Sequence, residues 1–369
     1  MPKGASVLLQ DFCRIIQGGR LGLSGHDFIP EGFPAYGAGG VNGYLASHEF
    51  DEPAVVLSAI GARCGKCFFA DGKWISLANT QLIFPDPARA DCKFLWHQLN
   101  DERRWHRSGT GQPFIKPSDV KAHRVFLPPL LEQRRIAEIL DKADALRAKR
   151  RTTLAQLDTL IQSIFFEMFG DPVTNPRGFP IVQMGEVCDV RDGTHDSPKY
   201  ISDGGYPLVT SKNVTGGVVD LSDVNYISEA DYIQINKRSK VDRGDIILPM
   251  IGTIGSPVIV DHEPSYAIKN VALIKFVKTS PSAVFVHHLL GGQYFDQIIS
   301  RKNRGGTQKF VSLGDLRAFP LPLPSNSEQQ EFAHRVESVE KTRAFCRTSE
   351  ADLNALFASL KHCAFQGEL

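Results

Sequence analysis

Two long stretches of the chain carry residues at alternating spacings of three and four, which is the pattern of a helix packed along one side. The first set is Leu140, Ala143, Arg147, Arg150, Leu154, Leu157, Ile161, Ile164 and Met168, and the second is Val336, Val339, Arg343, Cys346, Glu350, Leu353, Phe357, Leu360 and Ala364. The middle of each set is polar. Polar residues there can fix the register of a helix pair, or a local twist can turn them to solvent, and the pattern leaves both alternatives open.

The two stretches belong to an internal repeat. A shift of 196 positions aligns residues 112–169 with residues 308–365 without a gap, and the identities include Pro128 with Pro324 and Gln133 with Gln329. Upstream the similarity is looser and the shift changes: Gly61 falls on Gly252 and Asn79 on Asn270 at a shift of 191, which places insertions and deletions in loops. Each half is therefore a variable segment followed by a segment of fixed length.

The variable segments are predicted to be mixed and mostly β. Runs such as "AVVLSAIG", "DIILPMIG" and "VALIKF" are rich in Val and Ile and bounded by Gly, Pro and Asp. The expected fold is α+β, with two such domains separated by two long antiparallel helices and related by a pseudo-two-fold repeat. We expect a first domain over 1–126, a central helical spacer over 127–172, a second domain over 173–322 and a C-terminal helical spacer over 323–369.

The order domain, helix, domain, helix suggests what the repeat is for. If the helices pair antiparallel, they hold two similar domains apart, and DNA-binding proteins of two-fold symmetry contact half-sites about 34–36 Å apart. Because the two variable segments differ in sequence, the target would be bipartite and non-palindromic. Two unrelated helices buried in separate domains are the alternative, and the gapless repeat favours the helix pair.

Composition narrows the class of protein but not its ligand. The chain of 369 residues is 42% hydrophobic and 22% charged, as expected of a soluble protein with two domains. We find no apolar run long enough for a membrane span, no signal peptide and no disulfide framework among the seven scattered cysteines, so we expect a cytoplasmic location. A net charge of +1 neither supports nor excludes DNA, so the local charge must decide.

Basic loops containing Gly, Thr and Gln precede both helices, as "RRWHRSGTGQPFIK" and "RKNRGGTQKF". Arg and Lys attract phosphates, while Thr and Gln can bond to base edges. One such loop would be an ordinary surface loop, but two in matched positions favour DNA. The candidate DNA-binding residues are Arg63, Lys66, Arg103, Arg104, Arg107, Thr110 and Gln112 in the first half, and Thr194, His195, Lys212, Asn213, Lys269, Arg301, Lys302, Arg304, Thr307, Gln308 and Lys309 in the second.

We looked for catalytic and metal-binding motifs and predict neither. "GARCGKC" is one residue too short for a phosphate-binding loop and is better interpreted as a hairpin turn. Cys64 and Cys67 form a single pair without the second pair that structural zinc needs. Asp192, His195 and Asp196 in "DGTHDSP" lack a nucleophile motif beside them, and a turn ordered by short polar side chains is the better interpretation.

The segments "LPPLLEQRRIAEILDKADAL", "LIQSIFFEMFGDP", "DGTHDSPKY" and "SLKHCAFQGEL", together with the repeat, resemble the DNA specificity subunit of type I restriction–modification systems. The resemblance covers essentially the whole chain. It implies a non-catalytic subunit in which each variable segment is a target-recognition domain for one half of a split site. Residues 1–126 lack a counterpart of "DGTH", which leaves the DNA contacts of the first domain undefined.

The resemblance also implies partners. The helical spacers would dock two adenine-methyltransferase subunits, which would carry the S-adenosylmethionine, and nuclease/translocase subunits would complete a restriction enzyme directed at unmodified DNA. The specificity subunit itself would need no cofactor. The alternative is a protein-interaction scaffold whose paired domains do not bind DNA. The dependence of binding on salt concentration distinguishes these two hypotheses, because the affinity of a protein for DNA falls steeply as the salt concentration rises.

Overall fold

The computed structural model describes residues 5–19, 27–109, 111–202, 204–250, 256–277, 281–302 and 310–369. It divides into two compact units, one made of residues 1–153 with 346–369 and the other of residues 154–345. The boundary falls inside the two longest helices, α3 (Leu130–Phe169) and α9 (Asn326–Gln366). Both helices lie within the spacer segments expected from the sequence, and the division into four segments stays a prediction.

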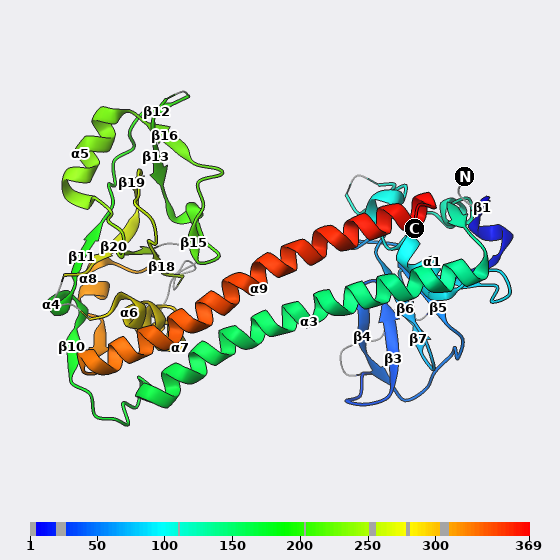
Figure 1. The fold of residues 1–369 in the computed structure, drawn as a ribbon, viewed down its shortest axis with the longest axis horizontal. Helices are drawn as coiled ribbons and strands as arrows, with labels where there is room; N and C mark the ends of the chain where they lie inside the picture. The colour runs from blue at the N-terminus through cyan, green and yellow to red at the C-terminus, as the bar shows by residue number, and fades with distance from the viewer. Residues whose placement is uncertain are drawn as a thin grey trace. The chain divides into compact units, whose positions relative to one another are not determined.

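The first unit contains two small sheets and one strand pair (Figure 1). The first sheet has the antiparallel order β2 (Cys13–Gln17), β8 (Thr80–Pro85), β5 (Ala54–Ser58) and β6 (Cys67–Ala70). The second has the order β4 (Gly40–Leu45), β3 (Phe33–Gly37) and β7 (Ile75–Ser76), with β3 and β7 parallel. The remaining elements are the antiparallel pair β1 (Ala5–Leu8) and β9 (Arg124–Leu127), the helices α1 (Cys92–Leu99) and α2 (Pro117–Lys121), and the 3-10 turns η1 (Leu9–Asp11) and η3 (Glu102–Arg104).

The second unit repeats this topology. Its first sheet has the order β11 (Asp189–Asp192), β20 (Val271–Lys275), β17 (Ile246–Pro249) and β18 (Val258–Ile259). Its second has the order β12 (Tyr200–Ile201), β16 (Asn225–Ile227), β13 (Tyr206–Val209) and β19 (Ala267–Ile268), again with one parallel pair, β13 and β19. The remaining elements are the strand pairs β10 (Ile181–Gln183) with β21 (Pro320–Pro322) and β14 (Val214–Thr215) with β15 (Val218–Val219), the helices α4 (Met184–Val187), α5 (Glu229–Ser239), α6 (Ala283–Leu290), α7 (Gln293–Lys302) and α8 (Leu313–Arg317), and the 3-10 turn η4 (Ser211–Asn213).

The apolar runs of the sequence form the central strands. Every residue of β5 and of β17 is buried, because other elements cover both faces of each strand. A strand of this kind has a continuous apolar run and no alternation. The hairpin from β5 to β6 contains "GARCGKC", so the interpretation of that motif as a turn is confirmed.

Within each unit, the segments of α3 and α9 lie side by side and antiparallel (Figure 1). In the first unit Ile136 and Leu140 of α3 pack with Leu360 and Ala364 of α9. In the second unit the C-terminal part of α3, from Ile161 to Phe169, packs with the N-terminal part of α9, including Phe332, Val336 and Val339. Residues early in α3 thus pack with residues late in α9, and residues late in α3 with residues early in α9. This order confirms the antiparallel pairing expected from the sequence.

Polar residues in the middle of the two helices bond across the pair. Arg147 Nε donates to Asn354 Oδ1 at 2.7 Å in the first unit, and Arg343 Nη2 lies 3.1 Å from Asp158 Oδ1 in the second. The internal repeat superposes one pair on the other. Arg150 Nη1 lies 3.1 Å from the Sγ atom of Cys346, which stands one repeat of 196 positions away. Of the two alternatives for these polar residues, the structure favours the one in which they fix the register of the helices.

The two long helices begin with similar sequences because each start contains a buried glutamine with the same contacts. Gln133 and Gln329 are 0% and 1% exposed. Their Nε2 atoms donate to the carbonyl oxygens of Pro128 and Pro324 at 2.8 and 2.9 Å. Their Oε1 atoms accept from the backbone N–H of Asp91 at 2.8 Å and of Ser282 at 2.7 Å, the residues that precede α1 and α6. Each glutamine thus fixes a short helix of its own unit to the start of a long one.

Among the described residues, no helix has both the length and the apolar character needed to cross a membrane.

Candidate nucleic-acid interface

The segment "DGTHDSP" forms a turn directly after β11, as the sequence predicted. Gly193 N–H donates to Val271 O and Thr194 N–H to Ile268 O, both at 3.0 Å, so the turn continues the edge of the sheet. A Cβ atom on Gly193 would lie 2.4 Å from Ile268 O, a distance that only glycine avoids. The Thr194 hydroxyl accepts from Asp196 N–H at 3.1 Å and closes the turn.

The imidazole of His195 is held at both nitrogens while the side chain remains 62% exposed. Its Nε2 lies 2.7 Å from Asp192 Oδ2, and its Nδ1 lies 2.9 Å from Asn270 Oδ1. The Asp192 carboxylate is buried and also pairs with Arg238. These contacts fix the direction of an exposed ring at the surface, which is the preorganisation that a recognition surface needs.

Candidate residues from separate parts of the sequence lie close together in the second unit. The backbone of Lys269 forms a parallel β-bridge with that of Thr194, and Lys269 Nζ donates to Ser197 Oγ at 2.7 Å. Ser211 Oγ lies 3.4 Å from the carbonyl oxygen of Asn270, which brings in the loop that carries Lys212. Thr194, His195, Lys212 and Lys269 thus surround the ends of β11, β13 and β19, and we call these four residues the β11-edge site.

Asn213, another candidate, has a role inside its own loop. It is 3% exposed. Its Oδ1 accepts from Thr210 N–H at 3.1 Å, and its Nδ2 donates to the carbonyl oxygens of Asp220 and Asp223 at 3.1 and 2.9 Å. The neighbouring Lys212 is half-exposed and lies 3.3 Å from the Asp223 carboxylate. Asn213 therefore shapes the loop, and Lys212 is the side chain that the loop presents.

The first unit contains the counterpart of this turn that the sequence did not reveal. Gly18 follows β2 as Gly193 follows β11, and Gly18 N–H donates to Thr80 O at 3.0 Å. A Cβ atom on Gly18 would lie 2.7 Å from Leu77 O, the position that matches Ile268 O in the second unit. Asn79 and Asn270, beside these glycines, both have positive φ angles, of 66° and 55°. The only signal in the sequence was the pair "GG" in "IIQGGR".

The first basic loop is less positive than its sequence suggests. Arg103 bonds to the Asp101 carboxylate at 3.0 and 3.2 Å, and Arg107 lies 3.0 Å from the Glu102 carboxylate. Among the residues that the structure describes, Arg104 donates to a backbone oxygen alone, that of Gln98, at 3.3 Å. Gln112 is exposed at the tip of a turn in which Ser108 and Phe114 bond to each other, and Thr110 lies outside the described residues.

Most of the second basic loop lies outside the described residues. This holds for Arg304, Thr307, Gln308 and Lys309. Arg301 and Lys302 belong to the last turn of α7, where only their backbone is described. All six stay predictions.

Arg63 and Lys66 lie in the turn between β5 and β6. Arg63 Nη1 donates to Gly39 O at 2.8 Å and so links this turn to the one after β3. Lys66 Nζ stands 5.9 Å from the centre of the Phe68 ring. Both positions are compatible with a contact to phosphate, and both residues stay predictions.

Within the described ranges, no group of three or more His, Cys, Asp or Glu side chains is arranged to hold a metal ion. Cys64 and Cys67 are both buried, and burial raises the pKa of each thiol above its ordinary value. A raised thiol pKa disfavours the thiolate form that metal binding and nucleophilic attack require.

The family profile described as "Type I restriction modification DNA specificity domain" matches residues 5–158 and residues 176–355, once in each half. The chain belongs to this family. It is the specificity subunit of a type I restriction–modification system. In such a system the specificity subunit is not the catalytic subunit.

Two curated relatives agree with this assignment. The type I restriction enzyme MjaVIII specificity subunit of Methanocaldococcus jannaschii is 25% identical over 313 residues, 79% of this chain and 73% of the relative. The type I restriction enzyme EcoBI specificity subunit of Escherichia coli is 28% identical over 291 residues, 66% of this chain and 58% of the relative.

A solved structure shares the fold. The crystal structure of the type I restriction–modification S subunit from M. genitalium superposes with a TM-score of 0.66 and covers 99% of this chain and 96% of that one, at 15% sequence identity. The arrangement of two mixed α/β domains with two long helices is therefore a fold of the family.

Proposed function

We propose that this specificity subunit recognises a bipartite, non-palindromic duplex, with one half-site bound by each unit. One observation carries the proposal: the same backbone site, a glycine that follows an edge strand beside an asparagine of positive φ, occurs in both units. The backbone is shared, but the side chains around it differ, as two readers of different sequences require. A palindromic site would suit identical readers.

The β11-edge site supplies the chemistry for one half-site. Lys212 is an exposed cation and Lys269 a partly exposed one, and both are suited to phosphates, while the Thr194 hydroxyl and the His195 ring can bond to base edges. The contacts to Asp192, Asn270 and Ser197 hold this set in place before DNA arrives. For the first unit, Gly18 and Asn79 mark the equivalent region.

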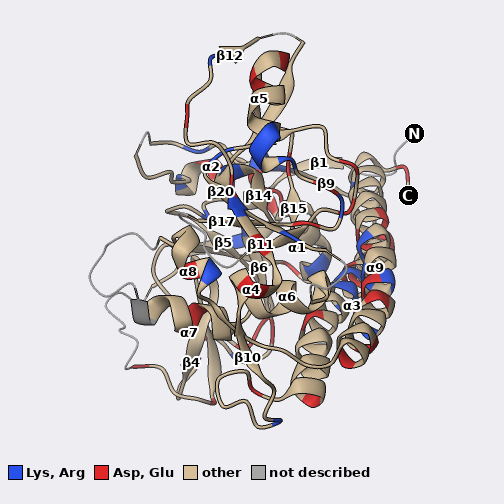
Figure 2. Ribbon diagram, turned by 90° about the vertical axis from the view of Figure 1, so that its left-hand side faces the viewer, with Lys and Arg blue, Asp and Glu red and all other residues tan. Residues whose placement is uncertain are grey.

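The long helices fit the role of a docking surface for protein. Lys and Arg occur together with Asp and Glu along both α3 and α9 (Figure 2). Large apolar side chains are exposed on both: Leu131 at 82%, Leu146 at 53% and Phe166 at 54% on α3, and Phe345 at 70% and Leu356 at 52% on α9. Exposed apolar residues on paired helices favour contact with helices of another chain.

The partner would be the methyltransferase subunit, which carries the S-adenosylmethionine. The internal repeat offers each docking contact twice, so the subunit binds two copies of it. Nuclease/translocase subunits would bind to that assembly. The exposed apolar residues occur in both halves of each helix, as a repeated docking site requires.

Salt-dependent DNA binding tests the proposal against the protein-scaffold alternative. The complex with the methyltransferase subunit is titrated with duplex DNA at several salt concentrations. We expect the logarithm of the binding constant to fall linearly with the logarithm of the salt concentration, and Lys269→Ala to reduce the slope by about 1. Lys341→Ala, on an exposed face of α9, is the control. Binding that is weak and insensitive to salt would support the scaffold.

A further inference from the structure

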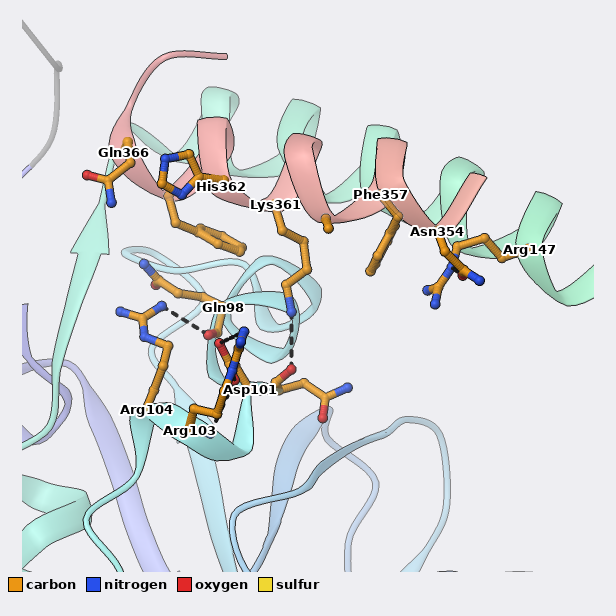
Figure 3. A pocket seen from close by; sticks show the side chains of 13 residues that line it. Gln98, Asp101, Arg103, Arg104, Arg147, Asn354, Phe357, Lys361, His362 and Gln366 are labelled. Carbon is orange, nitrogen blue, oxygen red and sulfur yellow. Dashed lines mark hydrogen bonds and ion pairs between the residues drawn. The ribbon is translucent and has the colours of Figure 1, made fainter. Parts of the chain in front are cut away.

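A pocket of about 590 Å³ lies in the first unit, where the C-terminal part of α9 faces α1 and the turn that follows it. It belongs to a different unit from the β11-edge site. Figure 3 shows side chains of Gln98, Arg103 and Arg104 on one side and those of Phe357, Lys361 and His362 on the other. The lining is completed by Asn100, Asp101, Arg147, Asn354, Ala358, Phe365 and Gln366.

Cations dominate this lining. Asp101 bonds to Arg103, and Arg147 bonds to Asp144, so these two arginines have carboxylate partners. Lys361 Nζ donates to the carbonyl oxygen of Asn100 at 3.1 Å, and Arg104 to that of Gln98 at 3.3 Å. Among the described residues, no carboxylate lies within ion-pair distance of Lys361 or Arg104, which leaves two positive charges for a ligand.

Lys361 is a partly buried lysine. Burial lowers the pKa of its ammonium group below the ordinary value, although Asp101 opposes this shift. A partly desolvated cation without a carboxylate partner destabilises a fold. A partly buried lysine with a shifted pKa marks a functional site more often than an exposed lysine does.

Gln98 provides a second, independent sign of a ligand. The residue is 1% exposed and belongs to the pocket lining. Neither its Nε2 nor its Oε1 atom has a hydrogen-bond partner among the described residues. A buried amide without hydrogen-bond partners destabilises the fold. A ligand with both a donor and an acceptor would remove this cost.

The second unit shows that the fold does not require a polar pocket at this place. Asp91 before α1 and Ser282 before α6 make the same glutamine contact, so residues of α1 correspond to residues of α6 that lie 191 positions later. Residues of α3 correspond to residues of α9 that lie 196 positions later. At the matched positions the second unit has apolar side chains, all buried: Leu289 for Gln98, Phe295 for Arg104 and Phe165 for Lys361. These pack in one hydrophobic core. The polar set of the first unit is therefore a local specialisation.

From these observations we propose that the pocket binds a nucleoside monophosphate, or a phosphate ester of similar size. The phosphate would lie between Lys361 and Arg104, because guanidinium and ammonium groups are the usual partners of phosphate. A bare phosphate would fill only a small part of 590 Å³, a volume within the range of pockets for small molecules. The Phe357 and Phe365 rings and the Gln98 amide are suited to a flat, hydrogen-bonding base.

Calorimetry on the full chain tests the proposal with adenosine 5′-monophosphate as the probe. We expect saturable binding of one equivalent, weaker binding of inorganic phosphate and none of adenosine. Lys361→Met and Gln98→Leu should each weaken binding at least tenfold, and both should fold, since the matched positions of the second unit are apolar. Lys341→Met, an exposed lysine of α9, should leave the affinity unchanged. Circular dichroism spectra and melting curves confirm the fold of each variant.

Three results would overturn the proposal. The first is the absence of saturable binding of both adenosine 5′-monophosphate and inorganic phosphate to the folded chain. The second is equal affinity in the wild type, Lys361→Met and Gln98→Leu. The third is binding of a different ligand class. Succinate that binds as tightly as the nucleotide would mean that the pocket binds carboxylates. Duplex DNA that displaces the nucleotide, with an affinity that Lys361→Met abolishes, would mean that the pocket binds the DNA backbone. DNA recognition by the β11-edge site survives each of these results.

Discussion

The two units place matching elements against the long helices but fill the contact differently. In the second unit Phe165, Phe169, Phe285 and Phe332 form one aromatic cluster, with ring centres 5.0–5.9 Å apart. In the first unit two of the matched positions keep their rings, Phe94 and Phe365, with centres 5.7 Å apart, but Lys361 replaces Phe165 beside a pocket. The contacts of Gln133 and Gln329 to a proline carbonyl and to the N–H before a short helix recur in both units. Backbone requirements recur with the repeat, and side chains diverge where nothing in the fold constrains them.

Replacing the matched residues Phe165 and Lys361 should give the largest difference between the units. Phe165→Ala removes a ring from a closed aromatic cluster and should cost about 3–5 kcal/mol in the free energy of unfolding. Lys361→Met should leave that free energy unchanged or raise it slightly, because it removes a partly buried charge. Urea unfolding followed by circular dichroism checks both. Equal losses in the two variants would show that the two contacts do not differ in energetic character.

The two buried glutamines should instead behave alike. Gln133→Met and Gln329→Met keep the volume of the side chain but leave a buried N–H and a buried carbonyl without partners. Each should lower the free energy of unfolding by about 2–3 kcal/mol. The exposed Gln156→Met on α3 is the matched control and should change it by less than about 0.5 kcal/mol. A large loss for one glutamine alone would mean that the shared contact matters in only one unit.

Two histidines at matched positions should make the stability of the fold depend on pH differently in the two units. His97 of α1 and His288 of α6 stand 191 positions apart, and burial lowers the pKa of both. The pKa of His288 falls to about 3, with His287 and Arg343 adding to the effect, whereas a hydrogen bond to the Asp141 carboxylate opposes the shift at His97. In the unfolded chain both have the ordinary value of about 6.5.

Acid should therefore weaken the fold through His288 more than through His97. Between pH 6.5 and 3 the unfolded chain binds a proton that the folded His288 does not, so stability falls as the pH falls. The loss from pH 7 to pH 5 should be on the order of 1–2 kcal/mol, and His288→Leu should remove it. Urea unfolding at a series of pH values measures the slope. A larger change of slope for His97→Leu than for His288→Leu would contradict this account.

The sequence was informative where the fold imposes a period. The spacing of three and four and the gapless repeat predicted two long helices, and polar positions such as Arg147 and Arg343 were visible as interruptions of the pattern. The family resemblance rested on these same segments. The hairpin at Cys64 and the turn at Gly193 followed from local turn chemistry.

Other features were beyond a reading of the sequence. The counterpart of Gly193 in the first unit is Gly18, where the requirement is a close approach of two backbones, and no side chain marks it. The pocket joins residues far apart in the chain, such as Asn100 and Lys361, which are 261 positions apart. Lys212, Lys269 and His195 stood on separate loops in the sequence, and only the sheet edge brings them together.

The central claim, that each unit recognises its own half-site, is tested most directly by mapping adenine methylation across a genome. The chain is co-expressed with its methyltransferase subunit, as the wild type and as Thr194→Ala/Lys269→Ala. We predict a bipartite, non-palindromic motif with a constant gap, and in the variant a relaxed preference at one half-site only. A contiguous or palindromic motif, or relaxation at both half-sites, would contradict the claim.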